Sequence, residues 1–441
     1  MPFKYLAQVF TVALAVASCT PTTVQPDLSG RSAASPSAPP LGPGPTDRPA
    51  LAVTAHVMRG RDWYLVPDGL PGPSPIAGVL VAFDADPSPT AAFARLRPGD
   101  RQAELAYATG PNLRAASFDV HGLSPGAYSI DIVERLAQGD TVVATHDFTL
   151  SAPEYVLWTL DFEGDASSDQ ALANTAGIAD EQKIPMTIMW NPRVWTTTQV
   201  SAARADAMLA WTKSRVADGD ELSLHLHMWT DFVRAAGLVP RTAPNWAGRS
   251  DGYDVPLTAY PEADQRALLD YALRLMSEHD LARPTTFRAG GQFANDATLR
   301  TLAALGFVAD ASAVPAGVFG RLPYPWTLAA DAQPYRPSAT DANKSGDLRL
   351  LEAPTIGGNT YAFDVRTIQP IIRADLSYLA PPGEIATSRR AITIVSHPGT
   401  IDATERAAIT ALFEALVPLR YDQDKGPVRF VTLAQLAQAW P

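Results

Sequence analysis

The sequence has 441 residues, 46% of them hydrophobic, and a formal net charge of −11. This length exceeds what one ordinary domain needs, so we expect two folded domains and a tail, with enough apolar side chains for a large core. The acidic balance argues against binding to nucleic acid and against a basic surface that holds anionic membranes. The single cysteine, Cys19, excludes an intramolecular disulfide and a cysteine-based zinc site.

The first fifty residues predict a lipid-anchored chain. A weakly basic start precedes the apolar run 6–17, which at about a dozen residues is too short for an ordinary membrane span. The small residues before Cys19 resemble the bacterial lipobox, so residues 1–18 are predicted to be a signal peptide and Cys19 the lipidated first residue. The alternative is an uncleaved apolar N-terminus. Residues 19–50, rich in Pro, Ser, Gly and Thr, are expected to form a flexible tether.

This anchor would place the protein in the bacterial cell envelope. An aspartate directly after the lipidated cysteine is associated with retention in the inner membrane. Here Thr20 follows Cys19, so the outer membrane or the periplasmic face is the favoured location. No later stretch of the sequence is long and apolar enough to span a membrane. Contact with the membrane is therefore expected through the lipid anchor only.

Residues 51–150 predict a small immunoglobulin-like β-sandwich. Turn residues separate short runs with the composition of strands, at 51–55, 78–83, 127–133 and 141–145. His56, His121 and His146 lie here without nearby residues of metal-ligand type, so we expect surface or turn histidines. Binding of carbohydrate, binding of a partner and a spacer role stay open for this region, and a spacer is the simplest.

From residue 151 to residue 441, apolar runs alternate with helical stretches, which predicts parallel strands joined by crossover helices. The expected strands cover residues 155–160, 184–190, 221–227, 285–287, 306–310, 348–352, 391–396 and 428–432. The expected helices cover residues 169–182, 202–217, 261–279, 295–305 and 403–416. About seven or eight such units favour a distorted (β/α)7-type barrel over an open sheet, so the fold class is α/β with a small β-sandwich before it.

Polar groups suited to metal-assisted hydrolysis stand at four of the predicted strand ends, where the active sites of α/β barrels lie. The segments are Asp161-Phe162-Glu163-Gly164, His225-Leu226-His227, Phe287-Arg288-Ala289-Gly290-Gly291 and Ser396-His397-Pro398-Gly399. Residues two apart share one face of a strand, which puts Asp161 beside Glu163 and His225 beside His227. Two imidazoles and one carboxylate make a facial ligand set for a divalent metal, Zn²⁺ being the first expectation. Each segment alone also fits a structural histidine, a turn or a core ion pair.

Residues from about 155 to 435 resemble polysaccharide deacetylases of the NodB-homology type, carbohydrate esterase family 4 in the broad sense. The resemblance is carried by residues 159–164 (TLDFEG), 221–229 (ELSLHLHMW), 287–291 (FRAGG) and 395–398 (VSHP). It implies a barrel of the glycoside hydrolase/deacetylase kind. It also implies a metal-dependent enzyme that removes acetyl groups, N-acetyl first, from a cell-envelope or extracellular polysaccharide.

The resemblance implies a role for each of six residues: Asp161 as base, Arg288 as the residue that orients it, His397 as general acid, and Glu163, His225 and His227 as metal ligands. The metal would polarise the acyl carbonyl and lower the pKa of water. The base would take a proton from that water, and the acid would donate one to the leaving amine.

The sequence departs from the family pattern in two places. Its carboxylates are two residues apart rather than adjacent, and Trp229 stands where the second metal histidine is expected, so that His227 takes its place. Glu163 is the preferred third ligand, and Asp165 is the alternative if a sharp turn at Gly164 brings it inward.

Two other functions remain open at the level of sequence. One is a catalytically decayed lipoprotein of the deacetylase fold that binds glycan, and the other is a metal hydrolase that acts on another amide or ester. Four tryptophans near the predicted strand ends are either platforms for sugar rings or side chains that pack beneath the loops: Trp190, Trp195, Trp229 and Trp326. The glycan, protein partners and oligomeric state are not predicted.

Overall fold

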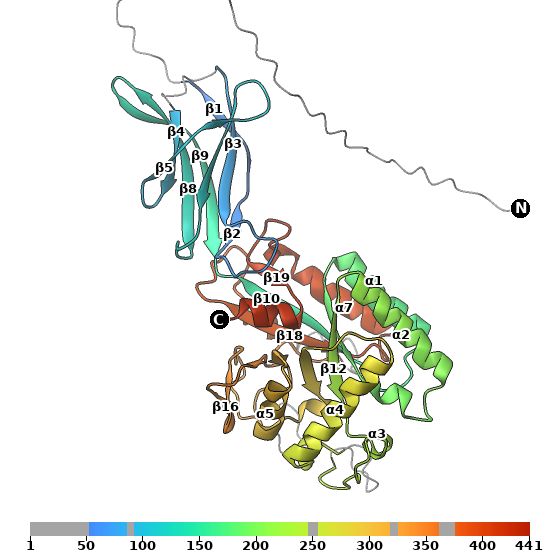
Figure 1. The fold of residues 1–441 in the computed structure, drawn as a ribbon. Coiled ribbons are helices and arrows are strands. Elements are labelled where there is room, and N and C mark those ends of the chain that lie inside the picture. Colours follow the sequence, from blue (N-terminus) through green and yellow to red (C-terminus); the bar gives the residue numbers. More distant parts are fainter. Residues whose placement is uncertain (1–52, 86–91, 246–254, 318–324, 361–374) are drawn as a thin grey trace, which may run out of the picture. The chain divides into compact units, whose positions relative to one another are not determined.

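The computed structural model describes residues 53–85, 92–245, 255–317, 325–360 and 375–441. Figure 1 shows a group of β-strands formed by the N-terminal described residues and an α/β region formed by the rest. Cys19, the expected tether and residues 51 and 52 lie outside the described residues, so the lipid anchor stays a prediction.

The N-terminal described residues form two β-sheets that share one core. The first sheet has the order β1 (Ala55–Gly60), β3 (Ile76–Phe83), β7 (Leu113–Asp119) and β6 (Ala106–Tyr107). The second has the order β2 (Trp63–Leu65), β9 (Gly139–Ser151), β8 (Gly126–Leu136), β4 (Ala92–Arg97) and β5 (Arg101–Glu104). Buried side chains of both sheets pack together, among them Val79, Val81, Phe118, Leu96, Ile130 and Phe148. Burial alternates along β3 with a period of two, as expected for a strand with one face on the core.

The strand expected over 51–55 begins outside the described residues; within them, residues 53 and 54 are not in a strand, and β1 runs from Ala55 to Gly60. Its start is set by pairing with β3, in which Ala55 lies opposite Phe83. The strands β2, β4, β5, β6 and β7 were not predicted, since they are short or carry charged residues on their exposed face.

The histidines of this region differ in their surroundings. His56 and His121 are exposed, as predicted. His146 is half-buried, and its Nε2 lies 2.9 Å from the carbonyl oxygen of Arg61. It is therefore a packed histidine rather than a surface one, although it has no part in any site.

The rest of the described chain is built around parallel strands. Their order is β17 (Leu351–Glu352), β14 (Ala309–Asp310), β13 (Thr286–Ala289), β12 (Glu221–Leu226), β11 (Met186–Trp190), β10 (Glu154–Asp161) and β18 (Arg390–Ser396), with β19 (Val428–Phe430) paired to the first half of β10. Each neighbouring pair is parallel. Side chains of β10 and β11 are buried throughout, as in sheets covered on both faces.

The parallel sheet curls until its two ends meet. After β17, the backbone N–H of Gly357 donates to Thr393 O at 3.0 Å, and that of Thr360 donates to Val395 O at 2.9 Å. Thr393 and Val395 belong to β18, at the other end of the strand order. This topology confirms the predicted distorted barrel.

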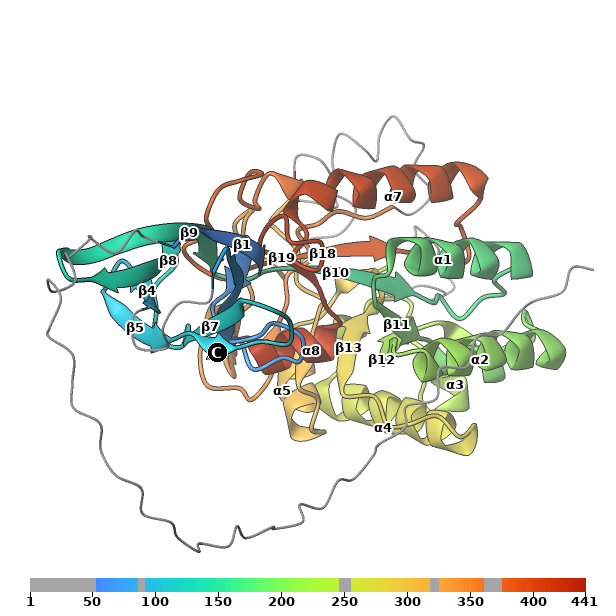
Figure 2. The same cartoon turned by 90° about the horizontal axis from the view of Figure 1, so that it is seen from above.

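Helices cover the outside of these strands, as Figure 2 shows for α7, α1, α2 and α4. The long ones are α1 (Asp169–Gln182), α2 (Ala202–Ala217), α4 (Glu262–Glu278), α5 (Asp296–Ala304) and α7 (Ala403–Ala415), all within two residues of the expected bounds. Side-chain caps from Ser168, Ser201, Asn295 and Asp402 fix four of their starts. No helix in the described ranges is long and apolar enough to cross a membrane.

The remaining elements are short and were not predicted. They are α3 (Thr230–Ala235), α8 (Leu433–Ala439), the antiparallel pair β15 (Pro337–Ser338) and β16 (Asp341–Ser345), and the 3₁₀ turns η1 (Pro192–Trp195), η2 (Leu257–Ala259), η3 (Gly290–Gln292) and η4 (Val417–Leu419). Two of them, α3 and η3, follow β12 and β13, which carry expected site residues, and η1 follows β11, the strand between β10 and β12.

Candidate metal centre and acid–base site

The carboxyl ends of the parallel strands bring the predicted residues together. Asp161 ends β10, and Glu163 follows two residues later; His225 lies in β12, and His227 directly follows it. In the same register, His225 of β12 lies opposite Arg288 of β13. His397 is the first residue after β18. Because the strands are parallel, all these side chains start from the same rim of the barrel.

The Glu163 carboxylate lies at the centre of three imidazoles. Its Oε2 is 2.5 Å from Nε2 of His227 and 3.9 Å from Nε2 of His225, and its Oε1 is 3.1 Å from Nε2 of His397. The three histidines are buried, whereas the Glu163 side chain keeps 25% exposure. Burial would raise the pKa of Glu163, but the imidazoles of His227 and His397 help to hold it well below its usual value.

The tautomer of His225 is fixed by the backbone. Its Nδ1 lies 2.9 Å from the carbonyl oxygen of Arg288, which can only accept a hydrogen bond, so Nδ1 carries the proton. Nε2 of the neutral ring is then an acceptor that points toward the Glu163 carboxylate, and it is buried without a hydrogen-bond partner among the described residues. An orphaned buried acceptor beside a carboxylate needs a positive group between them.

These contacts fit a divalent metal. Ligand atoms of Glu163, His225 and His227 all lie within 4.8 Å of one another. Two imidazole nitrogens and one carboxylate oxygen suit Zn²⁺ and leave further coordination positions open.

Asp165, the alternative ligand, lies elsewhere. Gly164 has φ of 81°, and the turn there sends Asp165 to Arg193, whose Nη1 lies 2.6 Å from Asp165 Oδ1. The Asp165 side chain is half exposed and is not part of the ligand cluster. The structure therefore brings Glu163, and not Asp165, to the two histidines.

Asp161 is held as a carboxylate by a buried arginine. Nη1 of Arg288 lies 2.7 Å from Asp161 Oδ1 and donates also to Thr159 Oγ1 at 2.8 Å, and Nε donates to the carbonyl oxygen of Ala311. Burial would raise the pKa of Asp161, but Arg288 and the nearby imidazoles lower it below its ordinary value. A charged, oriented carboxylate beside the candidate metal site can serve as a base.

The loop that carries His397 is held by a hydroxyl network that the sequence did not suggest. Ser396 Oγ accepts a hydrogen bond from Trp158 Nε1 and forms another with Thr360 Oγ1, both at 2.9 Å. The buried Glu405 carboxylate accepts from Thr360 Oγ1 at 2.7 Å and from Thr400 Oγ1 at 3.0 Å. These partners lie on β10, β18, α7 and the loops that contain Thr360 and Thr400, and no spacing in the sequence connects them.

Gly290 makes room for one metal ligand. A Cβ at this position would lie 2.5 Å from Cγ of His227, well inside any real contact distance. The backbone of β13 and the start of η3 therefore form the wall against which the His227 ring is seated. This explains a glycine in the 287–291 segment by steric fit rather than by backbone conformation.

The tryptophans near the site mostly pack beneath its loops. Trp190, Trp229 and Trp326 are buried, and Trp195 stacks on the His279 ring with centroids 3.8 Å apart. The interpretation of Trp190, Trp229 and Trp326 as exposed sugar platforms is therefore wrong, because their faces are occupied by the protein itself.

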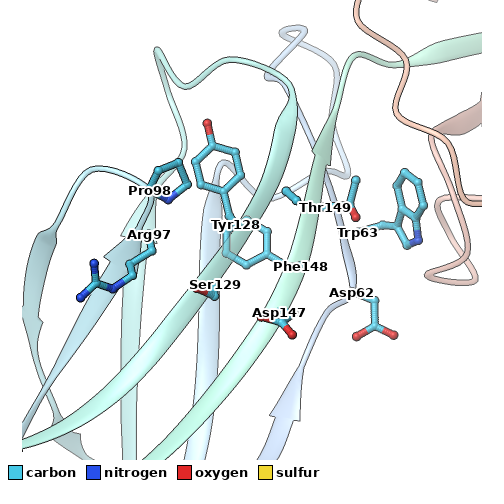
Figure 3. Close-up of a pocket in the computed structure, with 10 residues that line it drawn as sticks. Asp62, Trp63, Arg97, Pro98, Tyr128, Ser129, Asp147, Phe148 and Thr149 are labelled. Atoms are coloured by element: carbon cyan, nitrogen blue, oxygen red, sulfur yellow. The ribbon is translucent and has the colours of Figure 1, made fainter. Parts of the chain in front are cut away.

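A pocket of about 690 Å³ lies on the five-stranded sheet of the N-terminal region, away from the histidine cluster (Figure 3). Its aromatic lining is already engaged: Phe148 is buried, and the Tyr128 ring stacks on it while its hydroxyl donates to Ser124 O at 2.8 Å. The Arg97 guanidinium at its edge pairs with Asp131. The pocket shows no converging set of unused polar groups, so the chemistry lies at the barrel rim.

A second acidic pair is buried behind Arg288. Asp310 and Glu352 face each other across β14 and β17, and neither is exposed to solvent. Ser312 Oγ donates to Asp310 at 2.7 Å, and the backbone N–H of Ala313 donates to Glu352 at 2.8 Å. Burial raises the pKa of both groups, and the charge of Asp310 raises the pKa of Glu352 further, which favours one proton retained between the two carboxyls.

No protein-family model matches the sequence, and no curated protein sequence matches it. Solved structures similar to this chain include a candidate polysaccharide deacetylase from Mycobacterium smegmatis, with 17% identity, a TM-score of 0.41, and coverage of 65% of this chain and 89% of that one. The peptidoglycan deacetylase PdaC from Bacillus subtilis has 12% identity, a TM-score of 0.33, and coverage of 65% and 91%. A family 4 carbohydrate esterase from Streptomyces lividans has 12% identity, a TM-score of 0.32, and coverage of 59% and 87%.

At these identities and TM-scores the likenesses carry no conclusion about this chain. What this chain does is therefore argued from the geometry of its own site.

We predict that Gly290→Ala weakens metal binding by about tenfold or more, because the added methyl group displaces the His227 ring from Glu163. The measurement is a Zn²⁺ dissociation constant obtained by competition with a chelator. Gly126→Ala is the matched control, since a Cβ there meets nothing closer than 3.6 Å. Equal affinity in the Gly290→Ala variant and the wild type would show that His227 is not seated as described.

We predict that Glu352→Gln flattens the dependence of stability on pH. Because the folded-state pKa values of Asp310 and Glu352 are raised, the folded protein keeps a proton that the unfolded chain loses above the ordinary values of 3.8 and 4.5. The free energy of unfolding should then fall as pH rises, by up to about 1.4 kcal/mol per pH unit for one retained proton.

The glutamine amide donates to Asp310 without titrating, so the variant should lose less stability over that range. Urea midpoints measured between about pH 5 and about pH 8 give the comparison. Parallel curves for the wild type and the variant would exclude the shared proton.

Proposed function

We propose that this chain is a metal-dependent hydrolase that removes acetyl groups, N-acetyl first, from a polysaccharide of the cell envelope. The observation that carries the proposal is the orphaned Nε2 of His225, which faces Glu163 while Asp161 and His397 lie on either side of the same cluster. The choice of an acetylated glycan rests on the motif resemblance of residues 159–164, 221–229, 287–291 and 395–398.

The residues divide into a ligand set and an acid–base pair. Glu163, His225 and His227 would hold a divalent ion, which when bound polarises the acyl carbonyl and makes water more acidic. Asp161, kept ionised by Arg288, accepts the proton of the attacking water. His397 in its protonated form donates to the leaving nitrogen.

Arg288 also keeps the base and one ligand in register. Its guanidinium orients Asp161, and its backbone carbonyl oxygen fixes the proton of His225 on Nδ1. The base and a ligand therefore cannot shift independently, which maintains the reacting geometry.

The same donor set could hydrolyse other amides or esters, so the substrate must be tested directly. We predict that the purified protein with added Zn²⁺ releases acetate from N-acetylated glycan fragments and that O-acetylated fragments are poorer substrates. Acetate is measured by a coupled enzymatic assay. No acetate from either substrate class by the metal-loaded protein would overturn the proposal.

Two variants separate metal binding from proton transfer. His225→Ala should lower Zn²⁺ affinity by more than about 100-fold, because it removes a ligand. His397→Ala should retain the metal and lose about 10²–10⁴-fold in turnover, because it removes the acid. His121→Ala, at an exposed position outside the site, is the control. Full metal occupancy in His225→Ala would refute the ligand assignment, and unchanged turnover in His397→Ala would refute its role as acid.

We also propose that the mature chain is anchored to the membrane through a lipid on Cys19. Cys19→Ser should move the protein from the membrane fraction to the soluble fraction and abolish incorporation of labelled palmitate. A Cys19→Ser variant that stays in the membrane fraction, or a wild-type protein that takes up no label, would contradict this anchor.

A further inference from the structure

Arg193 occupies a position that the sequence did not single out. It lies in η1, directly after β11, the strand between β10 and β12. Its side chain is completely buried. Every nitrogen of the guanidinium donates a hydrogen bond. The partners are Gly164 and Asp165 after Glu163, Asp231 in the first turn of α3 after His227, and Gln199 farther along the chain from η1.

On one side, Arg193 holds the turn after Glu163. Nη1 donates to the carbonyl oxygen of Gly164 at 3.0 Å and to Asp165 Oδ1 at 2.6 Å. Gly164 has positive φ, and a Cβ there would lie 2.9 Å from Cβ of Arg193. The peptide next to the candidate ligand is therefore packed directly on this arginine.

On the other side, Arg193 holds the start of α3, which begins three residues after His227. Nε and Nη2 donate to the two carboxylate oxygens of Asp231 at 2.9 and 2.8 Å. The guanidinium carbon lies 4.2 Å from the centre of the Trp229 ring, which in turn lies 5.5 Å from the His227 ring. Such a forked pair and stacked face require the planar geometry of arginine.

We propose that Arg193 is a positioning residue that sets the separation of Glu163 and His227 and thereby the affinity of the site for a divalent metal. This inference rests on the proposed metal site. Burial alone would lower the pKa of Arg193, but Asp231 and Asp165 raise it, so the bridge stays charged. A lysine at the same place has one ammonium group and cannot form the fork to Asp231 while bonding the Gly164 carbonyl.

The test compares Arg193→Lys with a matched variant, Arg215→Lys. Arg215 is also a buried arginine between two aspartates, with Nε 2.7 Å from Asp220 and Nη1 2.7 Å from Asp180, but it contacts neither loop. Both variants should lower the urea midpoint. Only Arg193→Lys should raise the Zn²⁺ dissociation constant, by about 10- to 100-fold, and change the visible absorption spectrum of bound Co²⁺.

The outcomes distinguish this inference from the proposed function. Unchanged Zn²⁺ affinity and an unchanged Co²⁺ spectrum in folded Arg193→Lys would overturn the positioning role and leave the metal site intact. No metal binding by the wild type would overturn the proposed function and this inference with it.

Asp231→Asn keeps Arg193 and removes one charge of the fork, so it gives the same comparison if Arg193→Lys does not fold. The expected result is a smaller rise in the Zn²⁺ dissociation constant. Wild-type affinity in this variant, measured in folded protein, would count equally against the inference.

Discussion

The Glu163 carboxylate, set against three buried imidazoles, is the interaction on which the rest of the site depends. A carboxylate removed from water is unfavourable unless positive or donating groups meet it. Here the compensation is uneven: His227 and His397 lie within hydrogen-bond distance, whereas Nε2 of His225 faces the same carboxylate at 3.9 Å as a second acceptor. The burial of these groups is therefore only partly compensated. A divalent cation would bind the Glu163 carboxylate and Nε2 of His225 at once. The geometry thus favours a metal ion for a physical reason, independent of any likeness to other proteins.

The parallel order of the strands brings the residues of this cluster together. Strand ends of a curled parallel sheet meet at one rim, so residues from segments more than 200 positions apart, such as Asp161 and His397, become neighbours without long loops. Register then sets the fine geometry. His225 lies opposite Arg288, and this pairing directs a backbone carbonyl to the ring nitrogen of His225.

Much of the barrel and of its site was predictable from the sequence, because the patterns that indicate them lie within short segments. Strands and helices of the barrel followed from apolar runs and helical periodicity, and pairs two residues apart on one strand end were expected to share a face. What was not predictable depends on side chains that meet from separate loops. The choice between Glu163 and Asp165 turned on the backbone at Gly164, and the destination of Asp165 is Arg193, a residue in an irregular turn. The Asp310–Glu352 pair likewise joins two strands of two residues each, which carry no periodic pattern.

The two histidines of the H-x-H segment are held in different ways. In the H-x-H arrangement, His225 is anchored by the backbone of the adjacent strand, whereas His227 lies just beyond the strand and depends on its surroundings. Two constraints seat it: the absence of a side chain at Gly290 and the Trp229 ring beside it. Trp229 therefore supports the candidate ligand His227. Since Arg193 stacks on Trp229 and also bonds the Gly164 carbonyl oxygen, one buried cation contacts both the turn after Glu163 and the ring that lies beside His227.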